Sequence, residues 1–189
     1  MAKLPDISDA VTFDENLREV PRWPDRIAYA IRRGRRQLQE AREAGNETQI
    51  MRTLGYLTDA CRVAGETDAA VSYGQEALER SRAAGNRNAE VANLIRLGEA
   101  HKYRDEHETA ESLFREALAM TSAADADPLH DFALQHLGKC LLEQGRYDEA
   151  LQHLEQALEL RRAKGNQQLI ESTEAAIALA LTRQAEHPS

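Results

Sequence analysis

The chain has 189 residues, a length that favours one folded domain or one continuous stack of elements. Its 24 lysines and arginines are outnumbered by 32 aspartates and glutamates, and the formal net charge of −8 opposes attraction to nucleic acid or anionic lipid. We therefore expect neither a nucleic acid nor a membrane as partner. Aromatic residues make up 5% of the chain and charged residues 30%, and the abundance of Ala, Leu, Glu, Gln and Arg predicts an all-α protein.

The sequence contains no apolar run that approaches the roughly 18 residues of a membrane span. Residues 1–14 also lack the basic start and apolar stretch of a signal peptide. The two cysteines, Cys61 and Cys140, each lie inside a helical apolar pattern, which predicts two buried reduced thiols rather than a disulfide. These features lead us to expect a cytoplasmic protein.

The first 24 residues are expected to form a partly irregular N-terminal extension, because Pro21 and Pro24 interrupt any helix there. Within this extension, residues 4–20 combine acidic with apolar side chains. The acidic residues are Asp6, Asp9, Asp14, Glu15 and Glu19, and the apolar residues are Leu4, Ile7, Val11, Phe13, Leu17 and Val20.

From residue 25 onward the sequence repeats with a period of forty residues, and apolar and small residues recur at the same places in each period. The recurring apolar positions are Leu54, Leu94 and Leu134; Leu57, Leu97, Leu137 and Ile177; and Leu78, Leu118 and Leu158. The recurring small positions are Ala60, Ala100, Cys140 and Ala180; Ala70, Ala110 and Ala150; and Ala77, Ala117 and Ala157.

Glycine and asparagine mark the ends of the helices. The pairs Gly45-Asn46, Gly85-Asn86 and Gly165-Asn166 are in register, and each pair can end one helix and cap the next. In the third period Asp127-Pro128 takes this place, with Asp predicted as the cap and Pro as the first helical residue. We predict helices over residues 25–44, 47–64, 67–83, 87–104, 107–123, 128–144, 147–164 and 167–185. They form an array over residues 25–185, followed by a short tail at 186–189.

A single hairpin of two such helices cannot bury its own apolar stripe, so successive hairpins must stack into a solenoid. The alanine positions matter most, because a larger side chain at Ala110 or Ala150 would push neighbouring helices beyond their usual separation of about 8–10 Å. The pattern therefore indicates close approach of the helices.

These positions resemble the signature of the tetratricopeptide repeat. The second period matches it with Leu94, Leu97-Gly98, Ala110, Phe114 and Ala117. The third matches it with Leu134, Leu137-Gly138, Leu141, Ala150, Leu154 and Ala157. The first period departs from it, with Thr58 where glycine is usual and Gly74 where a bulky residue is usual. The resemblance implies an α-α superhelix, a solenoid of about three full repeats with half repeats at both ends.

The forty-residue period is similar to the longer-helix version of this repeat in kinesin light chains, cell-polarity adaptors and bacterial peptide-sensing or transcriptional regulators. In those families the array binds a peptide or protein segment, and the first helix of each repeat lines a concave groove. The resemblance therefore implies that the partner-binding residues lie at outward positions of these helices. They are Arg52, Tyr56, Asp59, Arg62, Arg96, Glu99, Lys102, Tyr103, Phe132, His136, Lys139, Glu143 and Arg183.

Basic residues outnumber acidic ones at these positions, although the whole chain is acidic. Because Arg and Lys form charge-assisted hydrogen bonds with carboxylates, we expect an acidic or carboxylate-bearing ligand, with Arg96 and Lys139 at the centre of its site. The alternative is that the basic side chains only pair with neighbouring acids such as Asp59 and Glu99.

Both ends of the chain offer further interpretations. Residues 4–20 either fold over the array, as an acidic occupant of the groove that a partner displaces, or cap its apolar end through Val11, Phe13 and Leu17. The last helix has apolar residues on more than one face, which favours self-association, so a homodimer is a second expectation.

No arrangement of residues indicates catalysis, a metal or a cofactor, and we expect none of the three. His107-Glu108-Thr109-Ala110-Glu111 only approaches a zinc-binding motif, because its second ligand position is Glu111. The basic run at residues 32–36 lies within a helical apolar pattern and is interpreted as a solvated helix face, rather than as a nucleic-acid patch.

The sequence thus predicts a non-catalytic protein–protein interaction scaffold that binds an acidic peptide or protein segment. Two alternatives stay open. One is a self-assembly module that dimerises through its terminal helix, and the other is a regulatory peptide-sensor subunit that acts through a separate effector.

Overall fold

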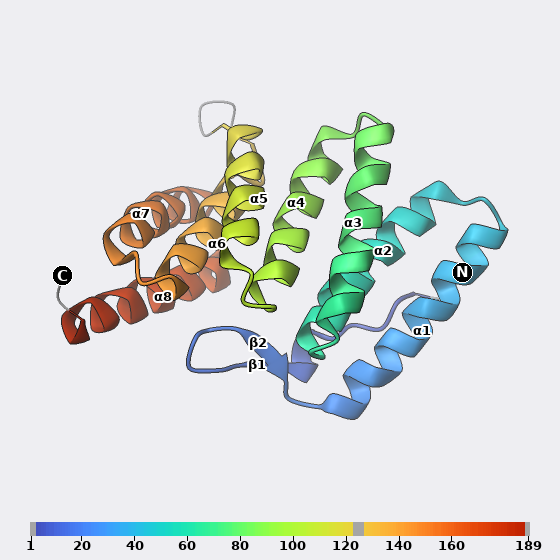
Figure 1. The fold of residues 1–189 in the computed structure, drawn as a ribbon, viewed down its shortest axis with the longest axis horizontal. Helices are drawn as coiled ribbons and strands as arrows, with labels where there is room; N and C mark the ends of the chain where they lie inside the picture. Colours follow the sequence, from blue (N-terminus) through green and yellow to red (C-terminus); the bar gives the residue numbers. More distant parts are fainter. Residues whose placement is uncertain (1–2, 123–126, 188–189) are drawn as a thin grey trace. The chain divides into compact units, whose positions relative to one another are not determined.

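The computed structural model describes residues 3–122 and 127–187 of the chain. Within these residues it contains a short 3-10 helix, two strands and eight α-helices (Figure 1). In chain order they are η1 (Ser8–Ala10), β1 (Val11–Phe13), β2 (Glu19–Pro21), α1 (Pro24–Glu43), α2 (Glu47–Val63), α3 (Thr67–Ala83), α4 (Arg87–Lys102), α5 (His107–Ala119), α6 (His130–Glu143), α7 (Tyr147–Lys164) and α8 (Gln167–Glu186).

The predicted helix-capping asparagines are confirmed. The side chains of Asn46, Asn86 and Asn166 each accept a hydrogen bond from a backbone N–H in the first turn of α2, α4 and α8, respectively. Before each asparagine a glycine adopts a left-handed conformation, with φ of 72° at Gly165, which ends the preceding helix. The glycine-asparagine pairs therefore set the helix boundaries for the reason that the sequence indicated.

The start of α6 differs from the prediction. Helix α6 begins at His130 rather than at Pro128, and its N-cap residue Leu129 makes no side-chain cap. Instead, the Asp127 carboxylate accepts a hydrogen bond from the backbone N–H of Leu129 at 2.9 Å and forms a turn before the helix. The predicted helix over 107–123 ends earlier, at Ala119, and its last predicted residue lies outside the described residues.

The helices divide into two compact units, Met1–Asp105 and Glu106–Ser189. In the first unit, each of α1 to α4 packs against the next helix, and α2 also contacts α4 directly. In the second unit, α5 to α8 pack in the same sequential manner, and α6 contacts α8. Each unit therefore places the first helices of successive repeats side by side, as in the predicted α-α solenoid.

The predicted small positions lie at the helix contacts. Ala70 and Ala77 on α3, like Ala150 and Ala157 on α7, have no solvent-exposed surface. Leu54, Leu94, Leu134 and Leu137 are buried with them, whereas Leu118 and Ile177 are half-buried. The core of each unit therefore combines large and small side chains.

A glycine facing a large residue allows the close approach of α6 and α7. A Cβ atom on Gly138 would lie 2.7 Å from Cγ of Leu154 and 3.2 Å from the carbonyl oxygen of Ala150. In the first repeat the sizes are exchanged, because Thr58 of α2 faces Gly74 of α3, where an added Cβ would lie 3.3 Å from Thr58 Cγ2. The two departures from the repeat signature therefore compensate each other.

The N-terminal extension contains a small hairpin that the sequence did not predict. Strands β1 and β2 pair antiparallel, with Phe13 opposite Glu19. The turn between them is closed by the Asp14 carboxylate, which accepts hydrogen bonds from the backbone N–H groups of Asn16 and Arg18. The acidic residues of the extension thus have local structural roles as well as charge.

Both cysteines are buried and free, as predicted. Burial raises the pKa of the Cys61 thiol to about 11, an effect that the nearby carboxylate of Glu66 strengthens and Arg35 opposes. This thiol is therefore protonated and unreactive at neutral pH. Separately, none of the helices within the described residues combines the length and the hydropathy needed to cross a membrane.

We predict that Gly138→Ala destabilises the protein by about 1–3 kcal/mol, because its methyl group would overlap the buried Leu154. The matched control is Gly55→Ala, where the added Cβ meets only the Arg96 side chain at an ordinary 3.5 Å. This control should be neutral or stabilising by up to ~1 kcal/mol, because alanine favours a helix. Urea denaturation measures both variants, and equal stability would contradict the packing described here.

Candidate protein-interaction site

The predicted binding residues of the first unit lie on two adjacent helices. Arg52, Tyr56, Asp59 and Arg62 belong to α2; Arg96, Glu99 and Lys102 belong to α4, and Tyr103 ends that helix. We call this set of side chains the α2–α4 face. Direct contact between α2 and α4 brings these residues together.

Charged side chains on the α2–α4 face pair both across the two helices and within α4. Arg96 Nε donates to Asp59 Oδ2 at 3.1 Å, and Lys102 Nζ lies 3.0 Å from Glu99 Oε1. Lys102 and Glu99 are buried, whereas Arg96 and Asp59 keep 38% and 39% of their side chains exposed. Arg96 and Lys102 thus pair with Asp59 and Glu99, the neighbouring acids that the alternative interpretation named.

The N-terminal segment lies against this face. We call residues 4–21 the strap. Its Pro5 carbonyl accepts a hydrogen bond from the Tyr56 hydroxyl at 2.9 Å, and its Glu19 carboxylate accepts one from Arg62 Nη2 at 2.5 Å. Leu4 and Ala10 of the strap are buried, but Phe13 is 60% exposed. The strap therefore lies over the α2–α4 face, and the exposed Phe13 does not cap the apolar end of the array. Displacement of the strap by a partner stays a prediction.

Tyr103 connects the strap to the basic side chains. The guanidinium carbons of Arg62 and Arg18 lie over its ring, 4.7 Å and 5.4 Å from the ring centre, respectively. Its hydroxyl accepts a hydrogen bond from the Glu19 N–H at 2.5 Å and lies 3.3 Å from the Glu19 carbonyl oxygen, to which it donates.

Both tyrosines of the face are protonated at neutral pH. Burial raises the pKa of Tyr103 to about 12, although the charge of Arg62 opposes this shift. Burial, together with Asp6, also raises the pKa of Tyr56 to about 12. Their hydroxyl groups can therefore donate hydrogen bonds to the strap carbonyls over the whole physiological pH range.

The remaining predicted residues lie in the second unit. Phe132, His136, Lys139 and Glu143 belong to α6, and Arg183 belongs to α8. His136 stacks on Phe114 with ring centroids 5.9 Å apart, and a Glu143 carboxylate oxygen lies 3.8 Å from His107 Nδ1. Phe132, His136, Lys139 and Arg183 are half-buried, whereas only 5% of the Glu143 side chain is exposed.

A buried ion pair in the second unit was missed by the sequence interpretation. Arg161 of α7 donates to the Asp131 carboxylate of α6 at 2.9 Å and to the Thr173 hydroxyl of α8 at 2.8 Å. Its guanidinium group also lies 5.1 Å from the centre of the Phe132 ring. The available signal was that Arg161 takes a position held by Ala41, Ser81 and Thr121 in the other periods.

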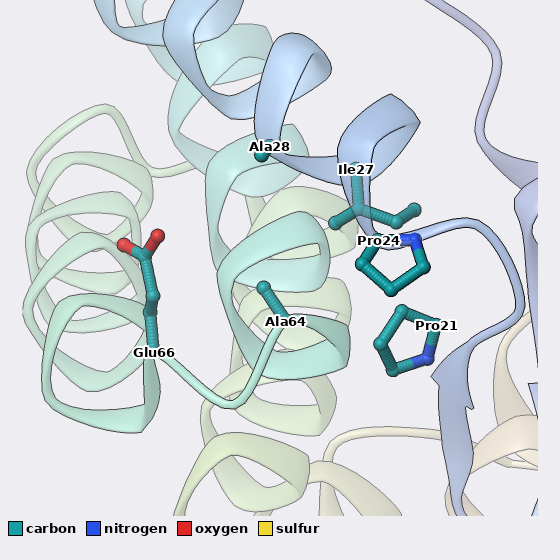
Figure 2. Close-up of a pocket in the computed structure, with 6 residues that line it drawn as sticks. All are labelled: Pro21, Pro24, Ile27, Ala28, Ala64 and Glu66. Atoms are coloured by element: carbon teal, nitrogen blue, oxygen red, sulfur yellow. The ribbon is translucent and has the colours of Figure 1, made fainter.

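A pocket of about 210 Å³ lies in the first unit, where the strap joins α1. Figure 2 shows Pro21 and Pro24 on one side of it and Glu66 on the other. Ile27, Ala28 and Ala64 complete an apolar lining, and the Glu66 carboxylate is engaged by Arg35.

The approximate zinc motif has a structural role. The Glu111 carboxylate accepts hydrogen bonds from Arg115, Arg146 and Gln144. Over residues 3–122 and 127–187, no three His, Cys, Asp or Glu side chains gather in an arrangement that would hold a metal ion.

The tetratricopeptide repeat model matches two overlapping stretches of the sequence, residues 49–123 and 88–163. The chain belongs to the tetratricopeptide repeat family. No curated protein matches this tetratricopeptide repeat chain.

Solved structures with the same fold share little sequence with it. The apo form of RapI superposes with a TM-score of 0.72 at 18% identity, covering 85% of this chain and 59% of RapI. A putative kinesin light chain from Podosopora anserina, with nearly identical TPR-like repeats, gives a TM-score of 0.66 at 14% identity, covering 88% of this chain and 83% of that one. MamA gives a TM-score of 0.52 at 17% identity, covering 87% of this chain and 92% of MamA. The chain therefore spans less than two thirds of the length of RapI.

Tetratricopeptide repeats typically form non-catalytic scaffolds for protein–protein interaction. Membership of the family accounts for the stacked pairs of helices in this chain. It does not specify a ligand, because a fold can present different sites.

We predict that the Arg96–Asp59 pair adds less than about 1 kcal/mol to stability, because both side chains are more than one third exposed. A double-mutant cycle with Arg96→Ala and Asp59→Ala, followed by urea denaturation, measures the coupling. A coupling well above 2 kcal/mol would show that Arg96 is needed for folding, and Arg96 would then be unsuitable as a probe of binding.

Proposed function

We propose that this chain is an interaction scaffold whose first-helix positions bind an acidic segment of a partner protein. One observation carries the proposal. An acidic segment of the chain itself, the strap, already lies on the α2–α4 face with its Glu19 carboxylate on Arg62. A face that holds one extended acidic segment has the chemistry to hold another.

The charges and aromatic groups of the face support this ligand class. Arginine forms short charge-assisted hydrogen bonds with carboxylates, and tyrosine adds rigid contact area at a low entropy cost. Arg52 is exposed on α2, and Arg96 keeps a third of its side chain in solvent despite its pairing with Asp59. For the second unit by itself, we propose that Phe132, His136, Lys139, Glu143 and Arg183 also bind an acidic segment.

We also propose a division of roles along the chain. Residues 25–185 form the binding array, residues 1–24 form an extension that regulates access to it, and residues 186–189 form a tail. A cytoplasmic location and the absence of catalytic activity belong to the same proposal. A regulatory peptide sensor that acts through a separate effector would use this site in the same way.

Self-assembly is the second candidate function, and the surface of α8 favours it. Leu181 is 51% exposed, and Ala175 and Ala178 on the same helix are also exposed. An apolar surface on a terminal helix can bind a second copy of the chain.

We expect Arg96→Glu/Lys139→Glu to lose a protein partner that the wild-type chain captures from native cell extract, because the reversed charges repel an acidic segment. The matched control is Arg32→Glu/Arg36→Glu, which makes the same charge change at exposed positions of α1. Mass spectrometry identifies the captured proteins.

A partner that is lost only with Arg96→Glu/Lys139→Glu supports the proposal. Equal capture by both variants would place the binding site elsewhere, and capture of the chain itself alone would favour self-assembly through α8.

A further inference from the structure

The buried side chain of Arg62 requires a carboxylate. Only 7% of this side chain is exposed, and a buried guanidinium group is costly unless it is paired and hydrogen-bonded. Its Nη2 donates to Glu19 at 2.5 Å, whereas its Nη1 lies 3.9 Å from a Glu99 oxygen. Within the described part of the chain, Nε and Nη1 of Arg62 have no hydrogen-bond partner. Arg62 therefore has donors that Glu19 leaves unused.

Tyr103 binds the backbone of the same strap residue. Its hydroxyl accepts from the N–H of Glu19 and donates to its carbonyl oxygen, so both main-chain groups of one extended residue are engaged. The Arg62 guanidinium group also lies over the Tyr103 ring, 4.7 Å from its centre, which favours this direction of the side chain. Backbone and side chain of Glu19 are thus bound by two adjacent residues.

The strap around Glu19 is weakly held. Strand β2 has three residues and pairs only with β1, and a two-stranded hairpin of this size is marginally stable alone. The neighbouring Arg18–Asp105 ion pair adds little, because the Asp105 side chain is 73% exposed. The hairpin itself therefore adds little to hold Glu19 in place, and a second glutamate can take over the contacts that Arg62 and Tyr103 make with it.

We propose that Arg62 and Tyr103 form a recognition site for one glutamate of an extended segment, and that Glu19 occupies it until an acidic partner segment displaces it. This inference rests on the proposed function and names the part of the α2–α4 face that discriminates the ligand. A partner glutamate is not constrained by the hairpin turn. It can accept two hydrogen bonds from the guanidinium group, where Glu19 accepts one.

A peptide copied from the strap tests the site without any knowledge of the partner. The probe is a fluorescently labelled peptide with the sequence of residues 13–21, titrated into the full-length chain and followed by fluorescence anisotropy. Loss of the Glu19 carboxylate raises the fraction of molecules with an open strap. We therefore expect Glu19→Ala to bind this peptide about tenfold more tightly than the wild-type chain.

Two matched controls isolate the carboxylate. Glu15→Ala makes the same charge change at an exposed strap residue and should bind the peptide as the wild-type chain does. A peptide with glutamine in place of the residue that corresponds to Glu19 should bind the Glu19→Ala chain about tenfold more weakly than the original peptide.

A variant of Tyr103 tests the backbone contact. Tyr103→Phe keeps the ring against Arg62 and removes only the hydroxyl group, so it avoids the folding defect expected of Arg62→Ala. Added to Glu19→Ala, it should weaken peptide binding by about tenfold while thermal unfolding shows a folded chain.

Equal binding of the glutamate and glutamine peptides would overturn the inference, as would equal effects of Glu15→Ala and Glu19→Ala or no binding to any variant. These results would leave the proposed function standing, because a partner can use other first-helix positions. The converse result is that the Glu19→Ala chain discriminates between the two peptides while Arg96→Glu/Lys139→Glu loses no partner. It would support the glutamate site and contradict the proposal that Arg96 and Lys139 bind the partner.

Discussion

Close helix contact, with a small residue facing a large one, is the constraint on which each unit depends. Gly138 leaves room for Leu154 between α6 and α7, and Thr58 faces Gly74 between α2 and α3. Adding or removing a single buried methyl group alters such a contact. The side chains that face each other on the two helices must therefore be matched in size. This matching allows α2 to contact α4, and α6 to contact α8, which places the first helices of successive repeats side by side.

The adjacency of α2 and α4 determines the electrostatics of the candidate site. Asp59 and Arg96 are distant in sequence but pair across the two helices, and Arg62 lies near Glu99. Arg62, Arg96 and Lys102 are consequently each paired with a carboxylate. The strap completes this arrangement, because Glu19 supplies the short carboxylate contact to the buried Arg62.

Much of the helical architecture was predictable because it depends on local interactions. Asparagine caps and left-handed glycines act within one turn of the chain, so their recurrence predicted the helix boundaries of α2, α4 and α8. The start of α6 was predicted less well, since Asp127 forms a turn there rather than a helix cap. The strap hairpin was not predicted, because its three-residue strands carry too little periodic signal.

The sequence by itself determined the family, the stacking of helical hairpins and the burial of both cysteines, because periodic apolar and small residues require a common core. It also indicated that the acidic strap and the basic first-helix positions are complementary. Only the tertiary structure decided which charges meet, since the Glu19–Arg62 and Asp131–Arg161 pairs join residues distant in sequence. Such pairs depend on side-chain direction and burial after the helices have packed, and the order of residues along the chain does not specify either.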